Sequence, residues 1–115
     1  MDKRVEAFKG NSFKVTNETT KGIEFENVVT REIVYLMPTV ELSIVLNPKT
    51  VEGNSWLQNK AHGLYHNTAL NQFPKRKNKG KSPIYYGYSF KFQTTEELSS
   101  FLSEMNSLGR ESSIV

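Results

Sequence analysis

The chain has 115 residues, of which 37% are hydrophobic and 23% charged, and its formal net charge is +3. This length suits one domain with a single modest core, and the composition lies well away from that of disordered chains. Because the chain contains no cysteine, disulfide scaffolds, thiolate zinc sites and cysteine nucleophiles are excluded. The first residues lack the apolar core of a signal peptide, and no apolar run approaches the roughly 18 residues of a membrane span, so we expect a cytoplasmic protein.

The first half of the chain predicts a four-stranded antiparallel meander. Residues 12–16 and 22–28 alternate apolar and polar side chains, as half-buried strands do. Residues 32–37 are apolar on both faces, which is typical of a central strand. Residues 40–46 carry an apolar side chain at every second position, and residues 47–48 (Asn-Pro) form a turn signal that closes this strand. The short connections leave no room for helical crossovers.

The second half predicts a short helix, a strand and a longer helix. Asn54 or Ser55 can cap a short or broken helix within residues 55–71, which Gly63 weakens. Residues 84–92 form a strand, and residues 94–97 (TTEE) form a capping box that opens the last helix. The apolar stripe of this helix consists of Leu98, Phe101, Leu102, Met105 and Leu108, and we expect Gly109 to end it.

Together these elements predict one α+β domain over residues 1–109, followed by a flexible tail at residues 110–115. The antiparallel sheet has about five strands, and the C-terminal amphipathic helix and the short middle helix pack on one of its faces. We expect Trp56 to lie in the core, and Glu24 and Glu26 to form the solvent side of an edge strand. An edge strand among the first four can also pair across a dimer axis, so the oligomeric state stays open.

The strand at residues 84–92 is rich in aromatic residues, which its period of two sorts onto two faces. One face carries Ile84, Tyr86, Tyr88, Phe90 and Phe92, and the other carries Tyr85, Gly87, Ser89 and Lys91. We expect the first face to fill the core beneath the C-terminal helix. Tyr85 is then the only ring left to stack on a base, unless a bulge at Gly87 reverses the faces over part of the strand.

Charge is distributed unevenly along the chain. Residues 1–52 carry seven lysines and arginines against eight aspartates and glutamates, a net charge of −1. Residues 53–95 carry seven cationic side chains and no acidic one, a net charge of +7, whereas residues 96–115 have a net charge of −3. A segment without carboxylates projects a positive field that attracts a polyanion or an acidic protein face.

Five of these cationic side chains lie within seven positions, in the basic loop at residues 75–81. Such a loop suits contacts to phosphates, which position a nucleic acid without reading its sequence. The predicted contact surface, within residues 53–95, comprises Lys60, His62, His66, Lys75, Arg76, Lys77, Lys79, Lys81, Tyr85 and Lys91.

His62 and His66 are four residues apart, a spacing that places both on one face of a continuous helix and can hold zinc. The glutamate of the HExxH motif is absent, because Gly63 follows His62, and no carboxylate lies nearby in sequence as a third ligand. The scattered glycines form neither a phosphate-binding loop nor a dinucleotide fingerprint. We therefore predict no metal, no cofactor and no catalytic residue.

Two hypotheses of function follow, both non-enzymatic. In the first, a small basic protein binds DNA or RNA without sequence specificity, mainly through phosphates. In the second, the protein is a modulator or inhibitor of the phage or mobile-element type, whose basic face docks on an acidic partner protein. A third and minor alternative is a metal-independent ribonuclease that uses His62 and His66 as acid and base, a role for which two histidines on one helical face are poorly placed.

Overall fold

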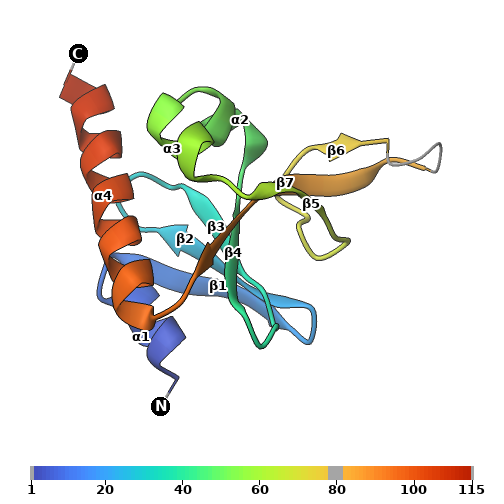
Figure 1. Ribbon diagram of the computed structural model, residues 1–115, viewed down its shortest axis with the longest axis horizontal. Coiled ribbons are helices and arrows are strands. Elements are labelled where there is room, and N and C mark those ends of the chain that lie inside the picture. The colour runs from blue at the N-terminus through green and yellow to red at the C-terminus, as the bar shows by residue number, and fades with distance from the viewer. Residues whose placement is uncertain (1, 78–81, 115) are drawn as a thin grey trace.

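The computed structural model describes residues 2–77 and 82–114, with side chains as far as residue 108 (Figure 1). In chain order the elements are α1 (Lys3–Lys9), β1 (Phe13–Thr19), β2 (Gly22–Asn27), β3 (Ile33–Leu36), β4 (Leu42–Leu46), α2 (Pro48–Glu52), α3 (Ser55–Lys60), β5 (Gly63–His66), β6 (Lys75–Arg76), β7 (Ile84–Phe92) and α4 (Thr95–Ile114). The predicted α+β class is confirmed.

All strand pairs in the described residues are antiparallel, in the order β1-β2-β3-β4-β7-β5, and β6 pairs separately with β7. The predicted meander of β1 to β4 and the strand at residues 84–92 are confirmed. The sheet has seven strands instead of about five, because β5 and β6 carry too little sequence signal to be recognised. β1 forms one edge of the strand order and β5 the other, so pairing of β1 across a dimer axis stays a prediction.

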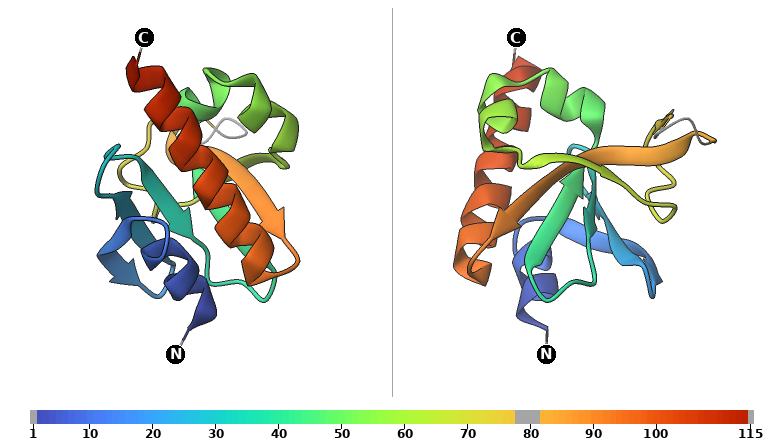
Figure 2. Two further views of the ribbon diagram at one scale, coloured as in Figure 1. Left: turned by 90° about the vertical axis from the view of Figure 1, so that its left-hand side faces the viewer. Right: turned by 45° about the vertical axis from the view of Figure 1, so that its right-hand side comes forward.

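The main core lies between one face of the sheet and all four helices. Phe8 of α1 stacks on Phe25 of β2 with ring centroids 4.0 Å apart, and Phe101 of α4 packs against Phe90 and Phe92 of β7. Figure 2 shows α4 running diagonally across this face of the sheet. The predicted packing of the C-terminal apolar stripe on β7 is therefore confirmed at the Phe90–Phe92 end of the strand.

Two short helices were not predicted from the sequence. In α1 the side chain of Asp2 accepts the N–H of Arg4 as an N-cap, and Phe8 is fully buried. In α2 the side chain of Asn47 accepts the N–H of Lys49 and Pro48 occupies the first turn. Proline is well tolerated there because the first N–H groups of a helix have no partner. The predicted turn at residues 47–48 is thus a helix start.

The predicted middle helix is short, since α3 ends at Lys60. Residues 63–66, which the apolar spacing placed on a helix, form β5 instead. The free edge of β7 explains this, because its backbone N–H and C=O groups need partners and β5 supplies them. As a result, Leu64 does not join the core and is 43% exposed.

The last helix begins as predicted, with the Thr94 hydroxyl accepting the N–H of Glu97 at 3.1 Å. The predicted stop at Gly109 is wrong, because α4 continues to Ile114. One glycine inside a helix costs only about 1 kcal/mol and does not by itself end it. None of the helices in the described residues combines the length and the apolar character needed to cross a membrane.

A second, smaller core covers the opposite face of the sheet. It consists of Tyr35, Met37 and Val45 from the strands, and Leu70 and Phe73 from the connection between β5 and β6. In Figure 1 this connection loops beneath the β5–β7 pair. Among the described residues it is the only segment without a helix that packs over a face of the sheet, and it leads directly into β6.

A buried carboxylate fastens this connection to the sheet. Glu24 is only 6% exposed, and its carboxylate accepts hydrogen bonds from Tyr35 (2.8 Å) and Thr16 (2.6 Å). The Tyr35 hydroxyl in turn accepts the backbone N–H of Gln72 at 3.1 Å. The prediction that Glu24 faces solvent on an edge strand is wrong, because β2 lies between β1 and β3. Burial, reinforced by the bond to Glu24, raises the pKa of Tyr35 well above its ordinary 10.0.

Gly87 lies where β7 passes the end of β4. A Cβ atom at this position would lie 2.5 Å from the carbonyl oxygen of Leu46, 2.6 Å from Val45 Cγ1 and 3.1 Å from Phe73 Cδ2. The registers of β7 with β4 and β5 run without interruption, so Gly87 forms no bulge. Glycine is needed here for close packing, and the two faces of β7 keep their alternation along the whole strand.

We expect Gly87→Ala to lower the free energy of unfolding by about 2–3 kcal/mol, because the added methyl group overpacks against a backbone carbonyl that cannot move freely. Urea denaturation measures the change. Gly53→Ala is the matched control, since its added Cβ meets nothing closer than 3.3 Å. Equal stability of the two variants would show that β7 does not pass β4 this closely.

Tyr35→Phe should cost about 1–3 kcal/mol, because it leaves the buried Glu24 with one donor fewer and the N–H of Gln72 without an acceptor. Its pH dependence is a second readout. Folding raises the pKa of Tyr35, so this contribution to stability is complete below about pH 10 and is lost as the pH rises further. Wild-type stability should therefore fall more steeply above pH 10 than that of Tyr35→Phe; parallel curves would argue against a buried, hydrogen-bonded phenol.

Candidate functional site

A narrow three-stranded ribbon projects from the body of the protein (Figure 1). We define the ribbon as residues 63–66, 75–76 and 84–88, that is β5, β6 and the first part of β7. On one edge of β7 the N–H of Asn67 donates to the carbonyl of Tyr85 (3.1 Å), and on the other the N–H of Tyr86 donates to the carbonyl of Pro74 (3.0 Å). β7 is therefore the middle strand of the ribbon.

Three planar side chains lie next to one another across one face of the ribbon. The His66 and Tyr86 rings are 5.9 Å apart between centroids and inclined by 25°, and the guanidinium carbon of Arg76 lies 5.6 Å from the Tyr86 centroid. Because His66 is on β5 and Arg76 on β6, the tyrosine lies between them. We call His66, Tyr86 and Arg76 the planar row. The two rings are half-buried and Arg76 is exposed.

The planar row reverses the predicted roles of Tyr85 and Tyr86. Tyr85 faces the other side of the ribbon, packs against the second core and has Lys75 Nζ 4.8 Å from its ring centroid. Tyr86 belongs to neither core among the described residues. In the described residues the ring contacts between α4 and β7 lie at Phe90 and Phe92. Tyr86 lies before the part of β7 that pairs with β4, a register that the sequence does not reveal.

Three cationic side chains lie on or next to the ribbon. Lys75, Arg76 and Lys77 are exposed, and none of them takes part in an ion pair within the described residues. Lys79 and Lys81, also predicted to bind, lie outside the described residues. At the base of the ribbon the Tyr88 hydroxyl donates to the Glu52 carboxylate at 3.0 Å. This bond, with partial burial, raises the pKa of Tyr88.

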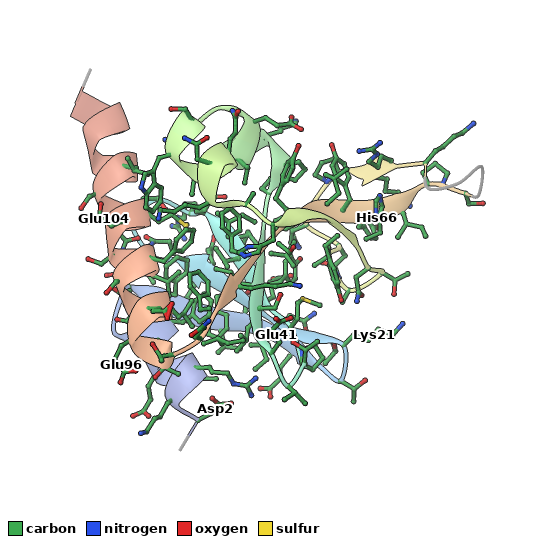
Figure 3. The ribbon with its side chains drawn as sticks, viewed as in Figure 1. Asp2, Lys21, Glu41, His66, Glu96 and Glu104 are labelled. Atoms are coloured by element: carbon green, nitrogen blue, oxygen red, sulfur yellow. The ribbon has the colours of Figure 1, made fainter. Side chains whose placement is uncertain are left out.

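Three other predicted residues lie elsewhere, around a groove of about 540 Å³ between α4 and the α3–β7 side. They are Lys60, His62 and Lys91. The groove has an aromatic floor that includes Trp56, Phe90, Phe92 and Phe101, and α4 contributes Glu96, Glu97 and Glu104 to its lining (Figure 3). Trp56, expected in the core, is half-buried and stacks on Phe101 at 5.4 Å.

One of the two lysines at this groove is ion-paired. Lys91 pairs with Glu41 at 3.3 Å, and Lys60 Nζ lies 5.2 Å from the centroid of the Trp56 ring. Three glutamates of α4 line the same groove, so this part of the segment at residues 53–95, which contains no acid in sequence, has acidic neighbours in the folded protein. Of the predicted residues that the structure describes, Lys60, His62 and Lys91 therefore lie at the groove, and the others lie on or next to the ribbon, where positive charge and the planar row occur together.

His62 and His66 do not share a helical face, because α3 ends before both of them. His62 Nδ1 accepts the N–H of Lys91 at 3.3 Å beside the groove, whereas His66 is in the planar row. Within the described residues His66 Nε2 is buried without a hydrogen-bond partner. Among all residues that the structure describes, no three side chains of His, Asp or Glu come together as metal ligands.

None of the family models, curated proteins or solved structures with which the chain was compared matches it.

Proposed function

We propose that the protein binds single-stranded DNA or RNA on the ribbon, without catalysis. Bases stack on the planar row, and backbone phosphates pair with Lys75, Arg76 and Lys77. The observation that carries the proposal is the row itself, in which Tyr86 lies between an imidazole and a guanidinium group. We also propose that the protein is located in the cytoplasm, as expected from the sequence.

Stacking supports an unpaired strand as the ligand. Each base stacked on an aromatic side chain contributes about 1–3 kcal/mol, and every base has a π face, so such binding tolerates any sequence. In a duplex these faces are covered by neighbouring base pairs. Exposed cations around the rings add contacts to phosphates that position the strand.

The planar row also separates this proposal from docking on an acidic protein. Lysine and arginine side chains attract either partner, but a row of partly exposed planar side chains adds affinity mainly for planar groups such as bases. The different surroundings of His62 and His66 support binding rather than ribonuclease chemistry, which requires an acid and a base on opposite sides of one phosphate. The acidic-partner hypothesis predicts no measurable binding of nucleic acid.

The test is a fluorescence-anisotropy titration against labelled single-stranded DNA and RNA and against a duplex, at about 50 mM and about 200 mM salt. We expect the single strands to bind more tightly than the duplex. Tyr86→Leu should weaken binding about tenfold or more because a base loses its stacking partner, while Tyr86→Phe should bind like the wild type.

Charge variants complete the design. Changing Lys75, Arg76 and Lys77 to Gln together should weaken binding and flatten its salt dependence. The matched control is the pair Lys60→Gln and Lys91→Gln at the groove, which should leave affinity nearly unchanged. The proposal fails if no nucleic acid binds at low salt, or if Tyr86→Leu binds as well as Tyr86→Phe.

A further inference from the structure

A second hollow lies beside the ribbon, with a volume of about 470 Å³. Thr20 and Lys21 of the β1–β2 turn and Thr39 of the β3–β4 turn line it from the body of the protein. His66, Thr68 and Ile84 are among the residues that line it from the ribbon side. Figure 2 (right) shows the β1–β2 hairpin and the ribbon projecting on the same side of the molecule, and Figure 3 labels Lys21 and His66 there.

The lining of this hollow suits an anion. Lys21 is its one lysine or arginine and no carboxylate lines it, as far as the described residues go. Lys21 Nζ donates to the Thr68 hydroxyl at 3.0 Å and takes part in no ion pair of the described chain. The two nearest acids along the hairpin, Glu18 and Glu24, do not line the hollow.

The hydroxyl groups complete a set of donors. Thr68 accepts the bond from Lys21 and therefore keeps its own proton to donate, and Thr20 makes no side-chain hydrogen bond within the described residues. An ammonium group in a hollow lined by two such hydroxyls matches the oxygens of a phosphate, and its bond to a charged phosphate oxygen is stronger than its present bond to a neutral hydroxyl.

The hollow is continuous with the planar row, because His66 belongs to both and Ile84 lies opposite Arg76 in the ribbon. We propose that Lys21, Thr68 and Thr20 bind a backbone phosphate of the same single strand whose bases stack on Tyr86. This inference rests on the proposed function, and it extends the binding surface to a turn that is 45 residues from His66 in the sequence.

The test compares Lys21→Gln with Lys9→Gln, a matched change at an exposed lysine on α1. With a labelled single strand, Lys21→Gln should bind about fivefold more weakly at about 50 mM salt, because one phosphate contact is lost. Its plot of log affinity against log salt should be shallower by about 0.7, the value for one phosphate contact to a single strand. Lys9→Gln should match the wild type in both respects.

Thr68→Val tests whether the position of the Lys21 ammonium group matters, without changing the charge of the protein. It removes the hydroxyl that holds Lys21 but keeps the ammonium group, so affinity should fall while the salt dependence stays that of the wild type. Thermal unfolding followed by circular dichroism checks that both variants fold. Titration with inorganic phosphate shows whether the hollow binds free phosphate or the phosphate of a nucleic-acid strand. We expect inorganic phosphate to displace the strand only weakly, and no more than chloride does at the same ionic strength.

The outcomes separate the two proposals. If Lys21→Gln behaves like Lys9→Gln while Tyr86→Leu still loses affinity, the phosphate site is wrong and the stacking surface stands. If inorganic phosphate displaces the strand at concentrations where chloride does not, the hollow is a site for free phosphate and the inference is wrong. If the strand does not bind the wild type at all, both proposals fail.

Discussion

Strand β7 is longer than the strand that anchors it, and the layout of the molecule depends on this difference. From Tyr88 to Phe92 it pairs with β4 and lies under α4, whereas before Tyr88 it pairs only with the short strands β5 and β6. Between the two parts, Gly87 allows the last carbonyl of β4 and the side chain of Val45 to lie within 2.6 Å of where a Cβ atom would be. A side chain here would push β7 away from the second core and change the direction in which the ribbon leaves the body.

Different segments pack on the two faces of the sheet, and how far they extend decides which aromatic rings belong to a core. Four helices cover one face, and the connection from β5 to β6 covers the other. Through Gln72, the buried pair of Tyr35 and Glu24 holds this connection in place. The same contacts that close the second core therefore place β6 beside Tyr86. In the described residues Tyr86 lies in neither core, whereas Tyr85 packs against the second one.

Charge in the sequence and charge in space are distributed differently. The segment at residues 53–95 contains no acid, yet Lys91 pairs with Glu41 and Lys60 borders a groove that α4 lines with glutamates. Conversely, Lys21 comes from a part of the chain with a net negative charge and lies next to the ribbon. Packing brings distant segments together. It places an acid next to one lysine of residues 53–95, and it adds Lys21 to the cations near the ribbon.

The sequence by itself determined the elements that carry a clear hydrophobic pattern, either a periodic repeat or an apolar run. The meander, the strand at residues 84–92 and the start and apolar stripe of α4 belong to this group, and with them the α+β class. It also located the basic residues at 75–77. The short elements α1, α2, β5 and β6 were missed, because two to seven residues carry too little periodic signal and their conformation depends on neighbours in space. Only the tertiary structure decided that Tyr85, and not Tyr86, packs on a core, that His62 and His66 lie apart, and that Lys21 lies beside the ribbon. Each of these depends on contacts between segments far apart in the sequence, which local propensity does not encode.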